Sequence, residues 1–277
     1  MSYKTILVHC NDKRRMKPLL APTLTLASAF QAHVVGLSVV PPVSVVATGA
    51  VGGPPIIVDA HCELYRQDVP DMRRQFEEAM LGRPVTSEWR ETDSGPFGVA
   101  DIVVEHGRAA DLIVAGQTDD DWPPGDWLDV ADRVAIESGR PVLIVPNGWT
   151  SAQVGDRALV AWNGRREAAR AVFDALPVLK QAKAVKVVSI AESADDEQQA
   201  NVDICTTLVR HGVKTDKTNR IVASVGAGPA LMVEVDAFAA DLVVMGCYGH
   251  SRLRELVFGG ATRHFLQKMR GPVLMSH

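Results

Sequence analysis

The two halves of this chain repeat one another, and this internal repeat limits the possible folds more than any other feature of the sequence. Residues 109–116 read AADLIVAG, and residues 239–246, 130 positions later, read AADLVVMG. A short proline-led strand is expected after each copy, at 141–145 and at 272–275. Matching segments in the same order predict two units of one fold within a single polypeptide.

The distance between matching segments changes along the chain. Leu7 and Asn11 match Leu159 and Asn163 at an offset of 152, whereas the later strands match at 130. At the second strands the offset is 151, between Val39 and Ile190, so the first half holds some 21 extra residues between its second and fourth strands. The stretch at 41–60 is rich in valine, glycine and proline, which is typical of a loop or flap, and it accounts for the excess.

Both halves alternate short β-branched runs with amphipathic stretches. This alternation is typical of a parallel sheet whose crossover helices cover both faces, so we expect an α/β fold. We place the first unit at 1–148 and the second at 155–277, on either side of a polar, turn-rich link. Strands are expected to begin near residues 4, 33, 86, 111 and 141 and to cover 158–162, 184–190, 217–223, 241–246 and 272–276, with helices at 61–82, 165–180, 196–211, 228–239 and 260–269.

Composition excludes several classes of protein. The formal charge of −4 lacks the concentrated positive charge that neutralises nucleic-acid phosphates, so nucleic acid is not an expected partner. No apolar run reaches the roughly 18 residues of a membrane span, and the start of the chain lacks the order of a secretory signal. The cysteines are far apart, which favours a reducing, cytoplasmic location over a disulfide framework and does not predict a metal site.

A glycine-rich segment follows the strand expected at 241–246. Its glycines, Gly246, Gly249 and Gly259, have the spacing Gly-x2-Gly-x9-Gly. Glycines let a backbone approach an anion closely, and a following helix offers unpaired N–H groups. The carboxyl end of a parallel strand is also where open α/β sheets bind ligands. The same glycines could instead end a strand, form a turn and precede a helix, and their pattern alone does not decide between the two.

With these motifs the chain resembles the universal stress protein family, most specifically over 240–274, where the glycine spacing, the flanking DLVVMG and the later GPVL match. The resemblance implies two tandem units, each a five-stranded parallel sheet of the adenine-nucleotide-binding type. It also implies dimer-like pairing of the units and ATP at the glycine loop, with magnesium only if ATP is bound. The implied ligand contacts are Asn163 to ribose or phosphate, the Ile190 backbone to adenine, Thr262 as a replacement hydroxyl, and the backbone of Gly246, Gly249, Gly259, Gly260 and Ala261. Arg252 stands beside the glycine loop, where it could either reach phosphate oxygens or be a solvated surface residue.

Two positions depart from the family pattern. Gly260 stands where the family has a serine or threonine after the third glycine. Asn163 stands where nucleotide-binding members often carry an acidic residue. In the first half, Asp119 and Asp129 replace two of the loop glycines. Carboxylates repel phosphate, so the first unit is expected to bind no nucleotide.

The sequence supports two functional hypotheses. The first is a regulatory stress-response protein that binds ATP in its second unit. The alternative is a nucleotide-free interaction module that acts through unit pairing and the 41–60 flap. A hydrolase is the least supported class, because no catalytic residue or general base is evident. For assembly, either the two units pair within one chain or two chains pair as a homodimer through the last strand, 272–276.

Overall fold

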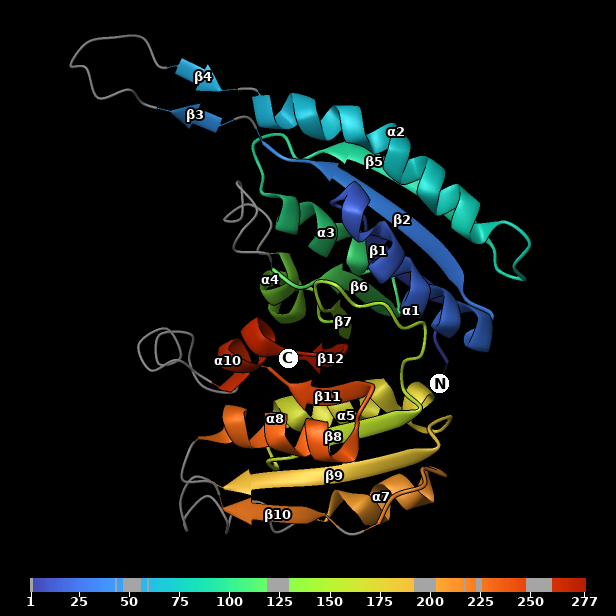
Figure 1. Ribbon diagram of the computed structural model, residues 1–277, viewed down its shortest axis with the longest axis vertical. Coiled ribbons are helices and arrows are strands. Elements are labelled where there is room, and N and C mark those ends of the chain that lie inside the picture. The colour runs from blue at the N-terminus through green and yellow to red at the C-terminus, as the bar shows by residue number, and fades with distance from the viewer. Residues whose placement is uncertain are drawn as a thin grey trace, which may run out of the picture.

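A computed structural model describes residues 2–42, 44–46, 56–58, 60–118, 130–191, 203–216, 218–222, 226–247 and 261–277. A ten-stranded sheet runs through the whole molecule (Figure 1). Its strands, in chain order, are β1 (Thr5–His9), β2 (His33–Val40), β5 (Ser87–Asp93), β6 (Leu112–Gly116), β7 (Val142–Val145), β8 (Arg157–Ala161), β9 (Ala184–Ala191), β10 (Asn219–Val222), β11 (Leu242–Gly246) and β12 (Val273–Ser276).

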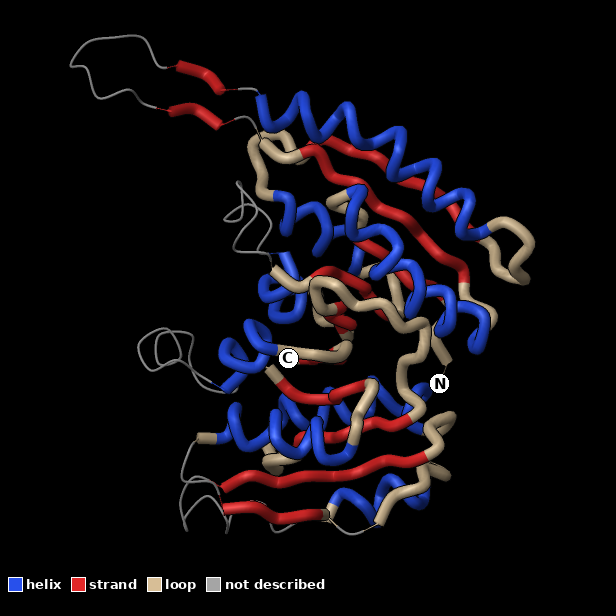
Figure 2. Tube along the Cα trace, viewed as in Figure 1, coloured by secondary structure: helices blue, strands red, loops and turns tan. Residues whose placement is uncertain are grey.

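Helices cover both faces of this sheet, as the tube in Figure 2 shows. One face carries α1 (Met16–Phe30), which follows the short η1 (Lys13–Arg15), together with α2 (Ala60–Met80), α5 (Arg166–Leu179) and α7 (Ile204–Arg210). The other face carries α3 (Val99–Gly107), α4 (Val130–Glu137), α8 (Ala227–Phe238) and α10 (Ala261–Lys268). The expected α/β fold with crossover helices on both faces is confirmed.

The two halves of the sheet have the same strand order. Reading outward from the middle, the first half runs β7-β6-β1-β2-β5 and the second runs β12-β11-β8-β9-β10. Each half therefore places its fifth strand at the join and its third strand at the outer edge. At the join β12 pairs antiparallel with β7, with Leu274 opposite Leu143. Within the chain, the last strand of one half thus pairs with the last strand of the other, and pairing of two chains as a homodimer stays a prediction.

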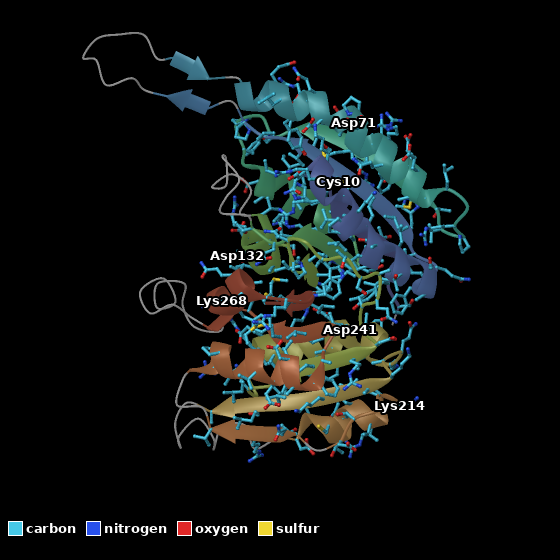
Figure 3. The ribbon with its side chains drawn as sticks, in the orientation of Figure 1. Cys10, Asp71, Asp132, Lys214, Asp241 and Lys268 are labelled. Atoms are coloured by element: carbon cyan, nitrogen blue, oxygen red, sulfur yellow. The ribbon has the colours of Figure 1, made fainter. Side chains whose placement is uncertain are left out.

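The repeated Ala-Ala-Asp motif has a structural role in both halves. The Asp111 carboxylate accepts hydrogen bonds from the backbone N–H groups of Lys4 and Thr5, at 2.7 and 3.0 Å. Asp241, labelled in Figure 3, accepts in the same way from Gly155, Asp156 and Arg157. Each carboxylate thus holds the start of the first strand of its half beside the start of the fourth, which explains why the motif occurs twice.

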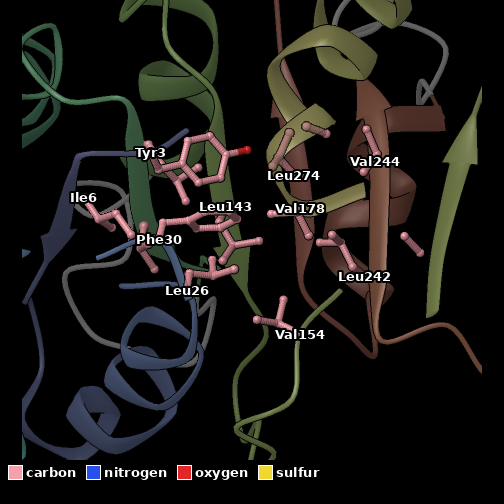
Figure 4. Packing of buried hydrophobic residues seen from close by; sticks show 14 of the residues in the cluster. Tyr3, Ile6, Leu26, Phe30, Leu143, Val154, Val178, Leu242, Val244 and Leu274 are labelled. Carbon is pink, nitrogen blue, oxygen red and sulfur yellow. The ribbon is translucent and has the colours of Figure 1, made fainter. Parts of the chain in front are cut away.

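Apolar packing is continuous across the join. Figure 4 shows Leu143 of the first half facing Val178 and Leu274 of the second. Tyr3 packs edge-on against Phe30, and its hydroxyl donates to the carbonyl oxygen of Asp174 at 2.7 Å. Because burial of apolar surface contributes about 25 cal/mol per Å², a core shared in this way couples the stability of the two halves.

The 41–60 stretch contains more structure than the expected loop. β3 (Ser44–Val46) and β4 (Ile56–Val58) form a separate antiparallel pair that projects from the main sheet (Figure 1). The rest of the flap between them lies outside the described residues. The helix expected at 196–211 begins later than expected, because the extended Asp203 caps α7 at Ile204, and residues 196–202 lie outside the described part. The other expected strands and helices agree with the structure to within a few residues. Within the described part of the chain, no helix has the length and apolar character to cross a membrane.

Candidate functional site

Three of the predicted site residues lie at one edge of the sheet. β9, β8 and β11 are adjacent and parallel, so their carboxyl ends meet there. Asn163 follows β8 by two residues, Ile190 is the next-to-last residue of β9, and Gly246 ends β11. We call these three residues the second-half edge. Its residues are accessible: Asn163 is exposed, and Ile190 and Gly246 are half-buried.

Asn163 organises the turn between β8 and α5. Its side-chain Oδ1 accepts a hydrogen bond from the backbone N–H of Arg165 at 3.1 Å. Asparagine side chains commonly form such turns just before a helix. The side chain is held at the helix entrance by this bond, and its Nδ2 can donate to a ligand.

Gly246 is required by close packing. A Cβ at this position would lie 2.5 Å from the backbone nitrogen of Ala168 and closer still to the carbonyl carbon of Glu167. Both atoms belong to backbone in the first turn of α5, so they cannot move aside as a side chain can. Gly246 therefore has a structural role, to let β11 end close against α5, whether or not a ligand binds beside it.

The remaining predicted residues concern the segment between β11 and α10. Gly249, Arg252, Gly259 and Gly260 lie outside the described residues. Ala261 is the first residue of α10, and Thr262 follows it with 5% of its surface exposed. The N-terminus of α10 is therefore the described part of the predicted phosphate-binding segment.

Sequence reasoning missed a buried carboxylate beside this edge. Glu167 is 4% exposed and forms an ion pair with Arg166. Burial alone would raise the pKa of Glu167, but hydrogen bonds from Arg166 and from its own backbone hold the pKa below the ordinary value. A comparison of the two halves singles out this position, because the matching residue of the first half, 152 residues earlier, is Arg15, which has the opposite charge.

The matching edge of the first half is closed. His9, Asn11 and Val39, which match Ala161, Asn163 and Ile190, are 1%, 5% and 1% exposed. Gly116, the counterpart of Gly246, is buried as well. The two halves share a backbone fold, but only the second leaves these positions accessible.

Arg15 lies directly against the glycine that ends the fourth strand of the first half. A Cβ on Gly116 would lie 2.7 Å from the Arg15 Cζ. The guanidinium donates to the backbone oxygen of Gln117 at 2.5 Å. Burial, and secondarily the charge of Arg15, lowers the pKa of His9 to about 3, so this histidine is neutral. A cation of the chain itself thus stands where a ligand phosphate would approach the first half. That this half binds no nucleotide stays a prediction, and Asp119 and Asp129 lie outside the described residues.

Metal ligands do not gather in the described part of the chain, where no group of three or more His, Cys, Asp or Glu side chains could hold an ion.

Comparison with known proteins finds similarity to one family in sequence and to several solved structures in fold. Residues 171–277 match the model of the Universal stress protein family. No curated protein matches the chain in sequence. A universal stress protein from Archaeoglobus fulgidus superposes with a TM-score of 0.72 at 15% identity, covering 98% of this chain and 95% of that one. A functionally unknown protein from Pseudomonas aeruginosa superposes with a TM-score of 0.57 at 14% identity, covering 99% of this chain and 92% of that one.

At these identities the solved structures establish the fold alone, and the family model identifies the second half by sequence. The resemblance noted from the glycine spacing is therefore confirmed: the chain carries a universal stress protein domain over residues 171–277 and shares the universal stress protein fold along nearly its whole length.

Proposed function

We propose that the second half binds an adenine nucleotide, ATP, at the second-half edge, and that the chain acts in the cytoplasm as a regulatory stress-response protein. The observation that carries this proposal is the contrast between the halves. Asn163, Ile190 and Gly246 are accessible, while Asn11, Val39 and Gly116 at the matching positions are buried.

Each accessible group suits one part of the nucleotide. The Asn163 amide can donate to a ribose hydroxyl or to a phosphate oxygen. The Ile190 backbone lies at the end of β9, where an adenine edge can pair with it. The N-terminal N–H groups of α10, which begins at Ala261, favour an anion at that end of the helix.

Regulation is proposed in preference to catalysis because the described groups near this edge do not form a base aimed at a ligand. Glu167, a buried carboxylate in the first turn of α5, is paired with Arg166. A general base needs hydrogen-bond reach to the proton that it removes. ATP would therefore act as a bound signal that stabilises one state of the protein, by mass action.

Calorimetric titration of nucleotide-free protein with ATP and magnesium tests the proposal. The diagnostic variant is Gly249→Asp, which copies Asp119 of the first half into the second loop. Gly125→Asp is its matched control, because it adds the same charge to the first-half loop. We expect one-site binding that is lost in Gly249→Asp and kept in Gly125→Asp.

Other outcomes are equally informative. Absence of saturable binding to the unmodified protein would overturn the proposal and leave the nucleotide-free interaction module as the function. Equal loss of binding in both variants would show that charge anywhere on the chain weakens ATP binding, and would overturn the placement of the site. Steady release of phosphate from bound ATP would contradict the regulatory assignment.

A further inference from the structure

Gln117 links the two halves at the end that carries the proposed site. It follows β6 directly in the first half, and its side-chain Nε2 donates to the carbonyl oxygen of Leu266 at 2.6 Å and to that of Gln267 at 3.3 Å. Both acceptors lie in the last turn of α10. The last four carbonyl groups of a helix have no partner within the helix, so Gln117 satisfies acceptors that α10 cannot satisfy itself.

The Gln117 side chain is held in place before it reaches α10. Its Oε1 accepts from the backbone N–H of Asn147 at 3.0 Å. Its backbone N–H donates to Val145 at 2.8 Å, and its carbonyl accepts from Arg15 at 2.5 Å. Residues fixed by several bonds lose little further freedom when they donate to one more partner. The amide of Gln117 is therefore a preorganised anchor.

The repeat provides this anchor on one side of the join only. Cys247 is the counterpart of Gln117, 130 residues later. The backbone N–H of Cys247 donates to the carbonyl oxygen of Ser276, just as the backbone N–H of Gln117 donates to the carbonyl oxygen of Val145. The backbone arrangement is the same in both halves. The side chain is not, because Cys247 has a thiol that donates to the Ser276 oxygen at 3.5 Å, with no amide to reach across the join.

α10 depends on contacts of this kind. It spans Ala261–Lys268, and helices shorter than about 12 residues are marginally stable without tertiary packing. Phe265 and Leu266 fix its apolar face, at 1% and 8% exposure, and Gln117 fixes the end of its backbone. Because a helix of this length moves as one body, an anchor at its last turn also orients its first turn.

We propose that Gln117 is a positioning residue for the nucleotide site of the second half. It holds α10, and with it the N–H groups that face the bound phosphates, from within the first half. The inference rests on the proposed ATP binding and adds the regulation of that site: Gln117, a residue of the half expected to bind no nucleotide, sets the affinity of the other half.

Two variants test this role in the full-length protein. Gln117→Met keeps the length of the side chain and removes the amide. Gln117→Glu keeps an oxygen that can accept from the Asn147 N–H. It replaces the donating amide with a second oxygen, which would face the carbonyl oxygen of Leu266. Asn147→Ala is the matched control, because it keeps the backbone N–H that Gln117 uses and removes only the Asn147 Nδ2 bond to Thr118.

The two measurements are ATP affinity by calorimetry and amide hydrogen exchange of residues 261–268 without nucleotide. We expect Gln117→Met to weaken ATP binding about three- to tenfold, the range that loss of one or two hydrogen bonds produces. We expect faster exchange confined to α10 and a larger loss of affinity in Gln117→Glu. Asn147→Ala should match the unmodified protein in both measurements.

Each of the other possible results would overturn one specific claim. If the unmodified protein does not bind ATP, the proposed function fails, and this inference with it. If it binds ATP and Gln117→Met binds within about twofold of it, only this inference fails. Faster exchange throughout the chain in both Gln117 variants would show a general structural role and would overturn the assignment of Gln117 as a positioning residue.

Discussion

Alanine at the two glycines that end the fourth strands should have unequal costs, although the strands match in sequence. At Gly246 the added Cβ meets backbone atoms of Glu167 and Ala168. At Gly116 it meets the guanidinium of Arg15, the far end of a flexible side chain. Backbone in a packed helix can yield only if α5 moves as a whole, whereas the Arg15 side chain can rotate away.

The expected free energies of unfolding follow from these contacts. Overpacking against fixed atoms costs about 1 to 3 kcal/mol and at times more, and the clash at Gly246 is severe, so we take about 3. Displacement of Arg15 loses its hydrogen bond to Gln117, which costs about 1.5 kcal/mol for a charged donor. Each alanine regains about 0.5 kcal/mol by restricting the unfolded chain, because neither glycine has a positive φ. Gly246→Ala should thus cost about 2.5 kcal/mol and Gly116→Ala about 1.

Urea unfolding followed by far-UV circular dichroism measures both costs. A difference of about 1.5 kcal/mol corresponds to about 3 to 6 °C in Tm for a chain of this size. Comparable stabilities for the two variants would refute the reasoning, because they would mean that α5 moves away from β11 as easily as Arg15 rotates. A greater loss in Gly116→Ala would refute it more directly.

Three further predictions concern single contacts. Tyr3→Phe removes the hydroxyl bond to Asp174 across the join and should cost about 1 kcal/mol in urea unfolding; an unchanged midpoint would contradict this. Since the pKa of His9 is lowered to about 3, the unfolded chain takes up the proton first. Stability should therefore fall as pH drops from about 6.5 toward 3, by about 2 kcal/mol at pH 5, and His9→Gln should remove most of that slope. Glu167 has a lowered pKa, so its contribution is present above its unfolded pKa and lost as pH falls through the folded value. Glu167→Gln should flatten the acid limb of the stability curve, and an unchanged limb would contradict the buried pairing with Arg166.

Most of the fold could be predicted because the repeat and the strand pattern are local signals. β-branched runs such as those of β6 and β11 identify buried parallel strands. The Ala-Ala-Asp motif marked the fourth strand in both halves because Asp111 and Asp241 each hold the start of a first strand. The strands of the flap were missed, since the composition of 41–60 is that of a loop and the pairing of β3 with β4 is a tertiary outcome.

The site was predictable only in part. Asn163, Ile190 and Gly246 could be assembled from sequence, because carboxyl ends of adjacent parallel strands must meet. Glu167 and Gln117 could not, since their environment depends on which helix turn and which half lie against them. Comparison of Arg15 with Glu167 at matching positions would have indicated a difference in charge between the halves, although not its burial.

The difference between the halves indicates how a repeat can separate structure from binding. Residues that hold the fold are the same in both halves. Asp111 and Asp241, at matching positions, each accept hydrogen bonds from the backbone at the start of a first strand. The carboxyl edges differ in their surroundings, because Arg15 lies against Gly116 and Asn11 is buried in the first half, while the matching Asn163 stays accessible in the second. The first-half edge also makes a contact across the join, where the Gln117 amide donates to α10. Under the proposed function, the residue that fills the first edge and the residue that positions α10 for the second act side by side, because Arg15 donates to the carbonyl oxygen of Gln117.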